Sequence, residues 1–152
     1  MNNLAGIGNE FRGDDAVGLL IAKKIRSQQL ANVQVVTLSD HLDNLLDLWA
    51  DREFVILVDA VRSEAAPGSI IYLDLFNDSL PPTLAATSTH ALDILQLVQL
   101  ARLLNRLPQS LAIVGIEGSS FAIGAEMTDP VRSALPKATE KILALFLEAG
   151  IE

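Results

Sequence analysis

The side chains of this sequence best suited to chemistry are three aspartates and one histidine. Asp14 and Asp15 follow a glycine-rich segment at positions 6–13, Asp59 follows an unbroken apolar run, and His90 precedes an apolar helical segment. Asp15, Asp59 and His90 would together offer two carboxylates and one imidazole. This donor set suits a divalent cation and leaves some of its coordination positions open. It forms only if the fold brings three distant segments together.

The paired carboxylates allow more than one interpretation. Gly8 and Gly13 have the spacing of a P-loop, but Asp14 and Asp15 stand where that loop has Lys and Ser or Thr, and Phe11 replaces the third glycine of a dinucleotide fingerprint. Two negative charges at a helix N-terminus would also repel a phosphate, which argues against nucleotide binding. Alternatively, the two acids only cap a helix and complement its dipole. One acid suffices for that, so the second suggests that a cation, or a proton donor on a substrate, is held there.

The other titratable candidates also have structural interpretations. An Asp at a strand end, such as Asp59, is a common turn former, and a lone histidine such as His90 at the start of a helix more often caps or packs. We interpret His41 as structural because it begins an exposed helix after Asp40. Glu117 is likewise expected only to finish a strand, although it lies at the edge where ligands bind.

The elements that must position these residues alternate between β-type runs and helical periods, a pattern that predicts the α/β class. We expect a three-layer α/β/α sandwich around a mostly parallel twisted sheet of about five strands. Strands are predicted at about 4–7, 33–38, 54–58, 69–75 and 111–116, with 69–75 antiparallel or at an edge, and helices at about 14–29, 42–49, 91–104 and 129–149. If strand 4–7 lies between 33–38 and 54–58, Asp15 and Asp59 emerge side by side.

The segment 91–104 is expected to be a largely buried helix. Its polar residues fall in one narrow stripe, formed by Asp93, Gln96, Gln99 and Arg102. Leu95 and Val98 are therefore predicted to lie in the core.

Composition limits the classes of partner. The 152 residues are 50% hydrophobic with a mean hydropathy of +0.35, which predicts one domain, 1–152, with a substantial core. Nineteen acidic against eleven basic residues give a net charge of −8, which opposes binding to nucleic acid or to an anionic membrane. No cysteine is present, so disulfides, thiolate metal sites and a Cys nucleophile are excluded. No apolar stretch approaches the length of a membrane span, and we expect a cytoplasmic location.

The motifs of the chain resemble those of a known family, the hydrogenase maturation endopeptidases. The matching residues are Gly6-Ile7-Gly8-Asn9, Asp14-Asp15-Ala16-Val17-Gly18, Leu57-Val58-Asp59-Ala60, Ser88-Thr89-His90, Leu107-Pro108, Gly115-Ile116-Glu117 and Pro130-Val131. Their order and spacing agree with the family from about residue 4 to 146. The resemblance implies a cytoplasmic peptidase that removes a short C-terminal extension from the large subunit of a nickel-iron hydrogenase after nickel has been inserted.

The resemblance also implies roles for individual residues. The family's metal ligands carry over to Asp15, Asp59 and His90, and its catalytic carboxylates to Asp15 and Asp59. Nickel, supplied by the substrate, is the implied metal, and zinc or cadmium could occupy the same donors. The implied partner is the precursor of the large subunit, and we expect a monomer. Two positions depart from the pattern: some relatives have Glu in place of Asp15, and Gly118 replaces a proline.

Two alternative functions use the same chain differently. The segment Gly118-Ser119-Ser120-Phe121-Ala122 follows a strand and approximates the nucleophile elbow of a serine hydrolase, although its last residue is Ala and no helix is expected directly after it. A non-catalytic nickel-binding chaperone would use Asp15, Asp59 and His90 without hydrolysis.

Overall fold

The computed structural model describes residues 2–39, 42, 44–76 and 90–150. A five-stranded sheet has the order β2-β1-β3-β5-β4, in which the first three pairings are parallel and the last is antiparallel. The strands are β1 (Asn2–Ile7), β2 (Val33–Leu38), β3 (Phe54–Val61), β4 (Ile70–Asp74) and β5 (Ser110–Glu117). The helices are the 3-10 turn η1 (Gly13–Ala16), α1 (Val17–Ser27), α2 (Leu45–Trp49), α4 (Ala91–Leu103) and α5 (Asp129–Glu148). The predicted α/β class and the antiparallel edge strand are confirmed.

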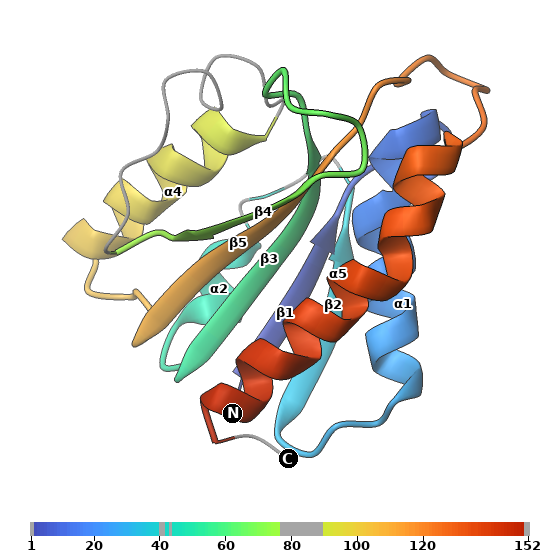
Figure 1. Cartoon of the computed structure of the whole chain (residues 1–152). Coiled ribbons are helices and arrows are strands. Elements are labelled where there is room, and N and C mark those ends of the chain that lie inside the picture. The colour runs from blue at the N-terminus through green and yellow to red at the C-terminus, as the bar shows by residue number, and fades with distance from the viewer. Residues whose placement is uncertain (1, 40–41, 43, 77–89, 151–152) are drawn as a thin grey trace.

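Helices cover both faces of the sheet, so the three-layer arrangement is also confirmed. Figure 1 shows α1 and α5 on one face and α2 and α4 on the other. The side chains of β3 alternate between two hydrophobic cores: Ile56 and Val58 pack towards α1 and α5, whereas Val55 and Leu57 pack towards α2 and α4. By the same alternation, Asp59 lies on the α4 side of the sheet. The strand pattern itself therefore directs this carboxylate towards the helix that His90 precedes.

Helix α1 lies unusually close to the sheet. A Cβ atom built on Gly18 would lie 2.5 Å from the carbonyl oxygen of Val58 and 2.6 Å from that of Ile7. Gly6 makes a matching approach, because its Cβ would lie 2.4 Å from the carbonyl oxygen of Gly18. The small residues let the first helical turn, which carries Asp15, sit directly against the ends of β1 and β3.

Several predicted boundaries were wrong. β1 begins at Asn2 rather than at Leu4, since the side chain of Asn2 is buried and its Oδ1 accepts the backbone N–H of Phe54 at 2.8 Å. β3 continues to Val61, so Asp59 lies within the strand instead of following it. The first helix is divided, with the 3-10 turn η1 preceding α1. Strand 33–38 was predicted correctly.

The expectation of a largely buried helix at 91–104 was also wrong. Ile94, Val98 and Ala101 are buried, but Leu95 is only partly buried. Leu103, at the end of α4, is 84% exposed. The helix thus buries one narrow stripe against the sheet and α2, and its C-terminal apolar residues face outward.

Among the residues that the structure describes, no helix is both long and apolar enough to cross a membrane.

Candidate active site

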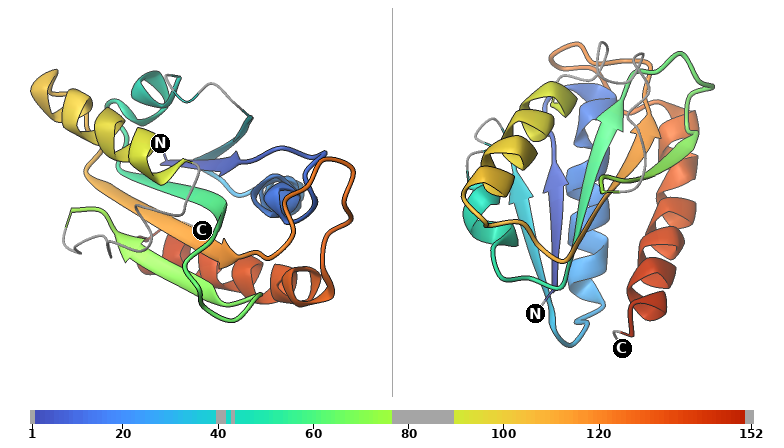
Figure 2. Two further views of the ribbon diagram at one scale, coloured as in Figure 1. Left: turned by 90° about the horizontal axis from the view of Figure 1, so that it is seen from above. Right: turned by 90° about the vertical axis from the view of Figure 1, so that its left-hand side faces the viewer.

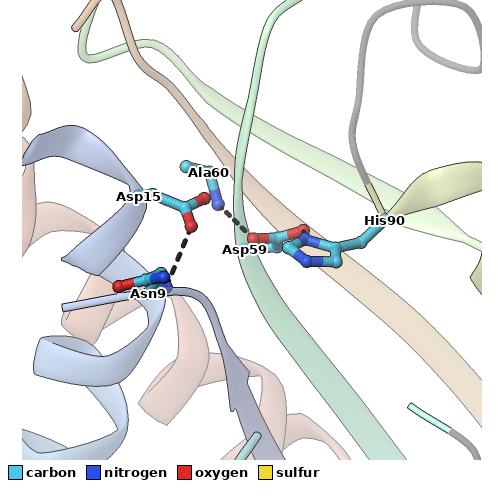
Figure 3. Close-up of polar contacts among 5 residues, drawn as sticks. All are labelled: Asn9, Asp15, Asp59, Ala60 and His90. Atoms are coloured by element: carbon cyan, nitrogen blue, oxygen red, sulfur yellow. Dashed lines mark hydrogen bonds and ion pairs between the residues drawn. The ribbon is translucent and has the colours of Figure 1, made fainter. Parts of the chain in front are cut away.

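Asp15, Asp59 and His90 meet at the edge of the sheet where the parallel strands end. One ligand atom from each of the three side chains can be chosen so that all lie within 4.8 Å of one another. Figure 3 shows Asp15 coming from the first turn, Asp59 from β3 and His90 from the residue preceding α4. The central place of β1 between β2 and β3 brings the first two together, as the sequence predicted. This arrangement can hold a divalent cation by its oxygen and nitrogen donors.

Asp59 and His90 form a buried pair. His90 Nδ1 lies 2.9 Å from Asp59 Oδ2, and Asp59 Oδ1 accepts the backbone N–H of Ala60 at 2.8 Å. Burial raises the pKa of Asp59 to about 6, against the opposing effect of the hydrogen bond from His90. The hydrogen bond to Asp59 in turn raises the pKa of His90. His90 makes no side-chain cap on α4, which argues against the interpretation that it only caps the helix.

Asp15 is more accessible than Asp59 and is held by the loop that precedes it. Asp15 Oδ2 accepts the backbone N–H of Asn9 at 2.9 Å, and Asn9 Oδ1 accepts the N–H of Phe11 at the same distance. Gly8 allows this loop to approach, since a Cβ there would lie 2.0 Å from the carbonyl oxygen of Asp15. Gly8 and Asn9 were recognised in the sequence only as motif residues, and this role was not predicted. An Asn side chain often accepts the backbone N–H two residues further along the chain and so forms a local turn. This tendency of Asn9 was the signal in the sequence for the ordered loop.

Asp14 has a different role from its neighbour. Its carboxylate is fully buried and accepts the backbone N–H groups of Ser119, Ser120 and Thr128 at 2.7 to 3.1 Å, as well as the Thr128 hydroxyl. Burial raises the pKa of Asp14, but these hydrogen bonds outweigh that effect and bring the pKa below its usual value. Asp14 therefore anchors the loop 118–128 to the first turn. It neither caps the helix nor belongs to the group that could bind a cation. Figure 2 shows this loop, in orange, beside the start of α1.

The remaining sequence candidates lie outside this group. Glu117 ends β5, as its structural interpretation predicted. It is also buried and accepts the backbone N–H and the hydroxyl of Ser63, so it fixes the turn after β3, a role that was not predicted. Ser119 belongs to an irregular segment in which no helix begins before Asp129, so the nucleophile elbow is not formed. His41 lies outside the described residues.

A pocket of about 400 Å³ opens beside the loop that holds Asp15. It is lined by Gly8, Asn9, Glu10, Phe11, Leu19, Lys23, Thr37, Leu38 and Ser39. Asp15, Asp59 and His90 do not line this pocket, but Asn9 lines it and donates its backbone N–H to Asp15. The pocket therefore neighbours the acidic group through the loop that holds Asp15.

Comparison with known proteins identifies the family. The family model described as hydrogenase maturation protease matches residues 19–145. The chain belongs to the hydrogenase maturation protease family. Its members are hydrolases of peptide bonds, and the resemblance seen in the sequence is confirmed.

Relatives of this maturation protease share most of their length with it. Protein FrxA of Pyrococcus furiosus is 30% identical over 140 residues, which cover 90% of this chain and 98% of FrxA. An endopeptidase from Escherichia coli is 28% identical, with a TM-score of 0.81 over 100% of this chain and 96% of its own. The hydrogenase maturating endopeptidase HybD from E. coli is 25% identical, with a TM-score of 0.78, covering 99% of this chain and 94% of its own.

Proposed function

We propose that this maturation protease removes the C-terminal extension of a nickel-iron hydrogenase large-subunit precursor after nickel insertion, and that Asp15, Asp59 and His90 are the residues that do so. The observation that carries the proposal is the convergence of their donor atoms within 4.8 Å in a chain of this family. Asp15 and Asp59 are the catalytic carboxylates, and all three side chains are metal ligands.

The donor set fits a divalent cation delivered by the substrate. Two carboxylates and one imidazole supply hard and borderline donors, and three protein ligands leave positions for groups of the substrate. Nickel already held by the precursor can share these donors, and zinc or cadmium can occupy them in its place. When bound, the metal supplies positive charge that polarises a carbonyl group. It thereby links cleavage to nickel loading.

The two aspartates are suited to moving protons during hydrolysis. A water molecule adds to the scissile carbonyl carbon while a carboxylate takes one of its protons, and that proton then passes to the leaving amine nitrogen as the C–N bond breaks. The pKa of Asp59, near 6, allows it to exchange a proton close to neutral pH. His90 holds the Asp59 carboxylate in place through the 2.9 Å contact. Asp15, on the more open side, is the carboxylate that faces the substrate.

The test is to mix chelator-stripped protease with nickel-free and nickel-loaded precursor and to follow release of the extension by mass spectrometry. We expect cleavage of the loaded precursor only. Equal cleavage of both precursors would refute recognition of the metal, and a parental rate for Asp59→Asn would refute its catalytic role. The matched control is Asp47→Asn, which removes an exposed carboxylate that forms an ion pair with Arg106 at 3.5 Å.

Membership of a protease family argues against the non-catalytic nickel chaperone considered from the sequence, and the same mixture tests this. A chaperone would bind nickel through Asp15, Asp59 and His90 and leave the precursor uncut. Nickel binding can be followed separately by calorimetry, in which His90→Gln is expected to weaken it at least tenfold. The proposal also includes a monomeric protein that acts in the cytoplasm. Sedimentation tests the first of these expectations, and fractionation tests the second.

A further inference from the structure

Two exposed apolar side chains, Phe11 and Ile123, stand on neighbouring loops at the edge of the candidate active site. Phe11 is 67% exposed and Ile123 is 74% exposed. The carbonyl oxygen of Phe11 accepts the backbone N–H of Gly124 at 2.8 Å, so the two loops are joined next to these side chains. Phe11 also lines the pocket beside Asn9. We call Phe11 and Ile123 together the apolar rim.

The backbone under the apolar rim is held in place by the site itself. Phe11 donates its N–H to Asn9 Oδ1, and Asn9 donates its own N–H to Asp15 Oδ2, each at 2.9 Å. The Ile123 loop is fixed from its other side, where Asp14 accepts hydrogen bonds from its backbone. An apolar side chain on a backbone that is already ordered loses little further entropy when a partner covers it. The apolar rim and the Asp15 carboxylate thus form one preorganised unit.

Not every apolar side chain on these loops is exposed, so a position on a loop does not by itself explain why Phe11 and Ile123 are exposed. Phe121, on the same loop as Ile123, is partly buried, packs against the core and lies under the guanidinium of Arg62 at 4.2 Å. Phe11 and Ile123 belong to neither hydrophobic core. Exposed charged residues surround them in sequence, namely Glu10, Arg12 and Glu126. An apolar centre with a charged border is the usual composition of a protein–protein contact.

We propose that the apolar rim is a docking surface for the protein substrate beside the bond that is cleaved. This inference rests on the proposed function. The occupant is a protein because a peptide bond must reach Asp15, and two successive hydrogen bonds through Asn9 connect the backbone of Phe11 to that carboxylate. A polypeptide seated at Asp15 therefore passes close to the loop that carries Phe11. A large aromatic residue near the centre of such a contact is where binding energy concentrates.

The experiment compares Phe11→Ser, Ile123→Ser and the double variant with Leu103→Ser, whose leucine is even more exposed but lies at the far end of α4. Steady-state cleavage of the nickel-loaded precursor is measured for each folded variant, as verified by circular dichroism. We expect Phe11→Ser to raise KM about tenfold, with a smaller change in kcat, and the double variant to raise it further. Leu103→Ser should keep the parental KM.

Binding of the same precursor is also measured without cleavage, by calorimetry, so that failure of the proposed function is distinguishable from failure of this inference. If the parental protein cuts nothing, the proposed function fails, and about tenfold weaker binding by Phe11→Ser still supports docking. Unchanged KM and Kd in the double variant would overturn the inference. So would sedimentation that shows a dimer of this chain which Phe11→Ser dissociates, because the surface would then pair two copies.

Discussion

Replacing Asp14 by asparagine should destabilise the protein far more than the same change at Asp15. The Asp14 carboxylate accepts three backbone N–H groups and one hydroxyl while fully buried. An asparagine offers a single carbonyl oxygen there, and its amide group would face at least one of those donors. Losing the charged acceptor and leaving one donor unsatisfied costs about 2 to 4 kcal/mol of unfolding free energy. At Asp15 the oxygen of an asparagine can still accept the N–H of Asn9, so we expect a loss below about 1 kcal/mol.

Urea denaturation of both variants measures this difference. Asp14→Asn should lower the urea midpoint at an unchanged m-value. Because the pKa of Asp14 is lowered in the folded protein, its stabilising effect is present above the unfolded value of 3.8 and is lost as the pH falls through the folded value. The difference between the parental protein and Asp14→Asn should therefore shrink in acid. If the two variants lose similar stability at neutral pH, the assignment of Asp14 as the anchor of the loop is wrong.

Three further outcomes are expected. The pKa values of Asp59 and His90 are both raised on folding, so the metal-free protein should lose unfolding free energy as the pH rises from 3.8 to about 6 through Asp59, and should lose more above 6.5 through His90. The double variant Asp59→Asn/His90→Gln should lack this slope in urea titrations. Ile94→Ala should cost about 2 to 5 kcal/mol in chemical denaturation, whereas Leu103→Ala should stay within about 0.5 kcal/mol; equal losses would show that the buried stripe of α4 is misplaced. Gly18→Ala should lower the thermal midpoint by an amount equivalent to about 1 to 3 kcal/mol, because the added Cβ would lie 2.5 Å from a carbonyl oxygen of β3, and an unchanged midpoint would contradict the close packing of α1.

Local patterns predicted much of the fold. The alternation and the β-branched residues of 33–38 were sufficient to predict β2. The neighbouring positions of β1 and β3 were predicted from a common topology of α/β sheets. That topology was enough to predict the convergence of Asp15 and Asp59. The end of β3 was missed because a charged residue looks like a strand terminator. Asp59 continues the strand because the N–H of Ala60 and the ring of His90 compensate its burial.

Long-range contacts account for the features that the sequence did not predict. Nothing near Asp14 indicates that its partners lie on the loop 118–128, so the sequence favoured capping, cation binding or contact with a proton donor of the substrate instead. The burial of α4 was overestimated for a similar reason. The polar stripe shows which side of a helix avoids the core, but how far the helix extends past its sheet depends on its neighbours. Leu103 carries no local sign that it will be exposed.

The anchoring of the loop by Asp14 also determines when the enzyme can become active during its own synthesis. Asp14 is separated from Ser119 by 105 positions and from Thr128 by 114. Contacts this distant in sequence form slowly and contribute only after most of the chain has collapsed. On the ribosome, Asp14 and Asp15 emerge long before the residues that fix their turn have been translated. A nascent chain therefore exposes Asp14 and Asp15 early but cannot hold them in their folded arrangement until the residues through Thr128 have left the exit tunnel.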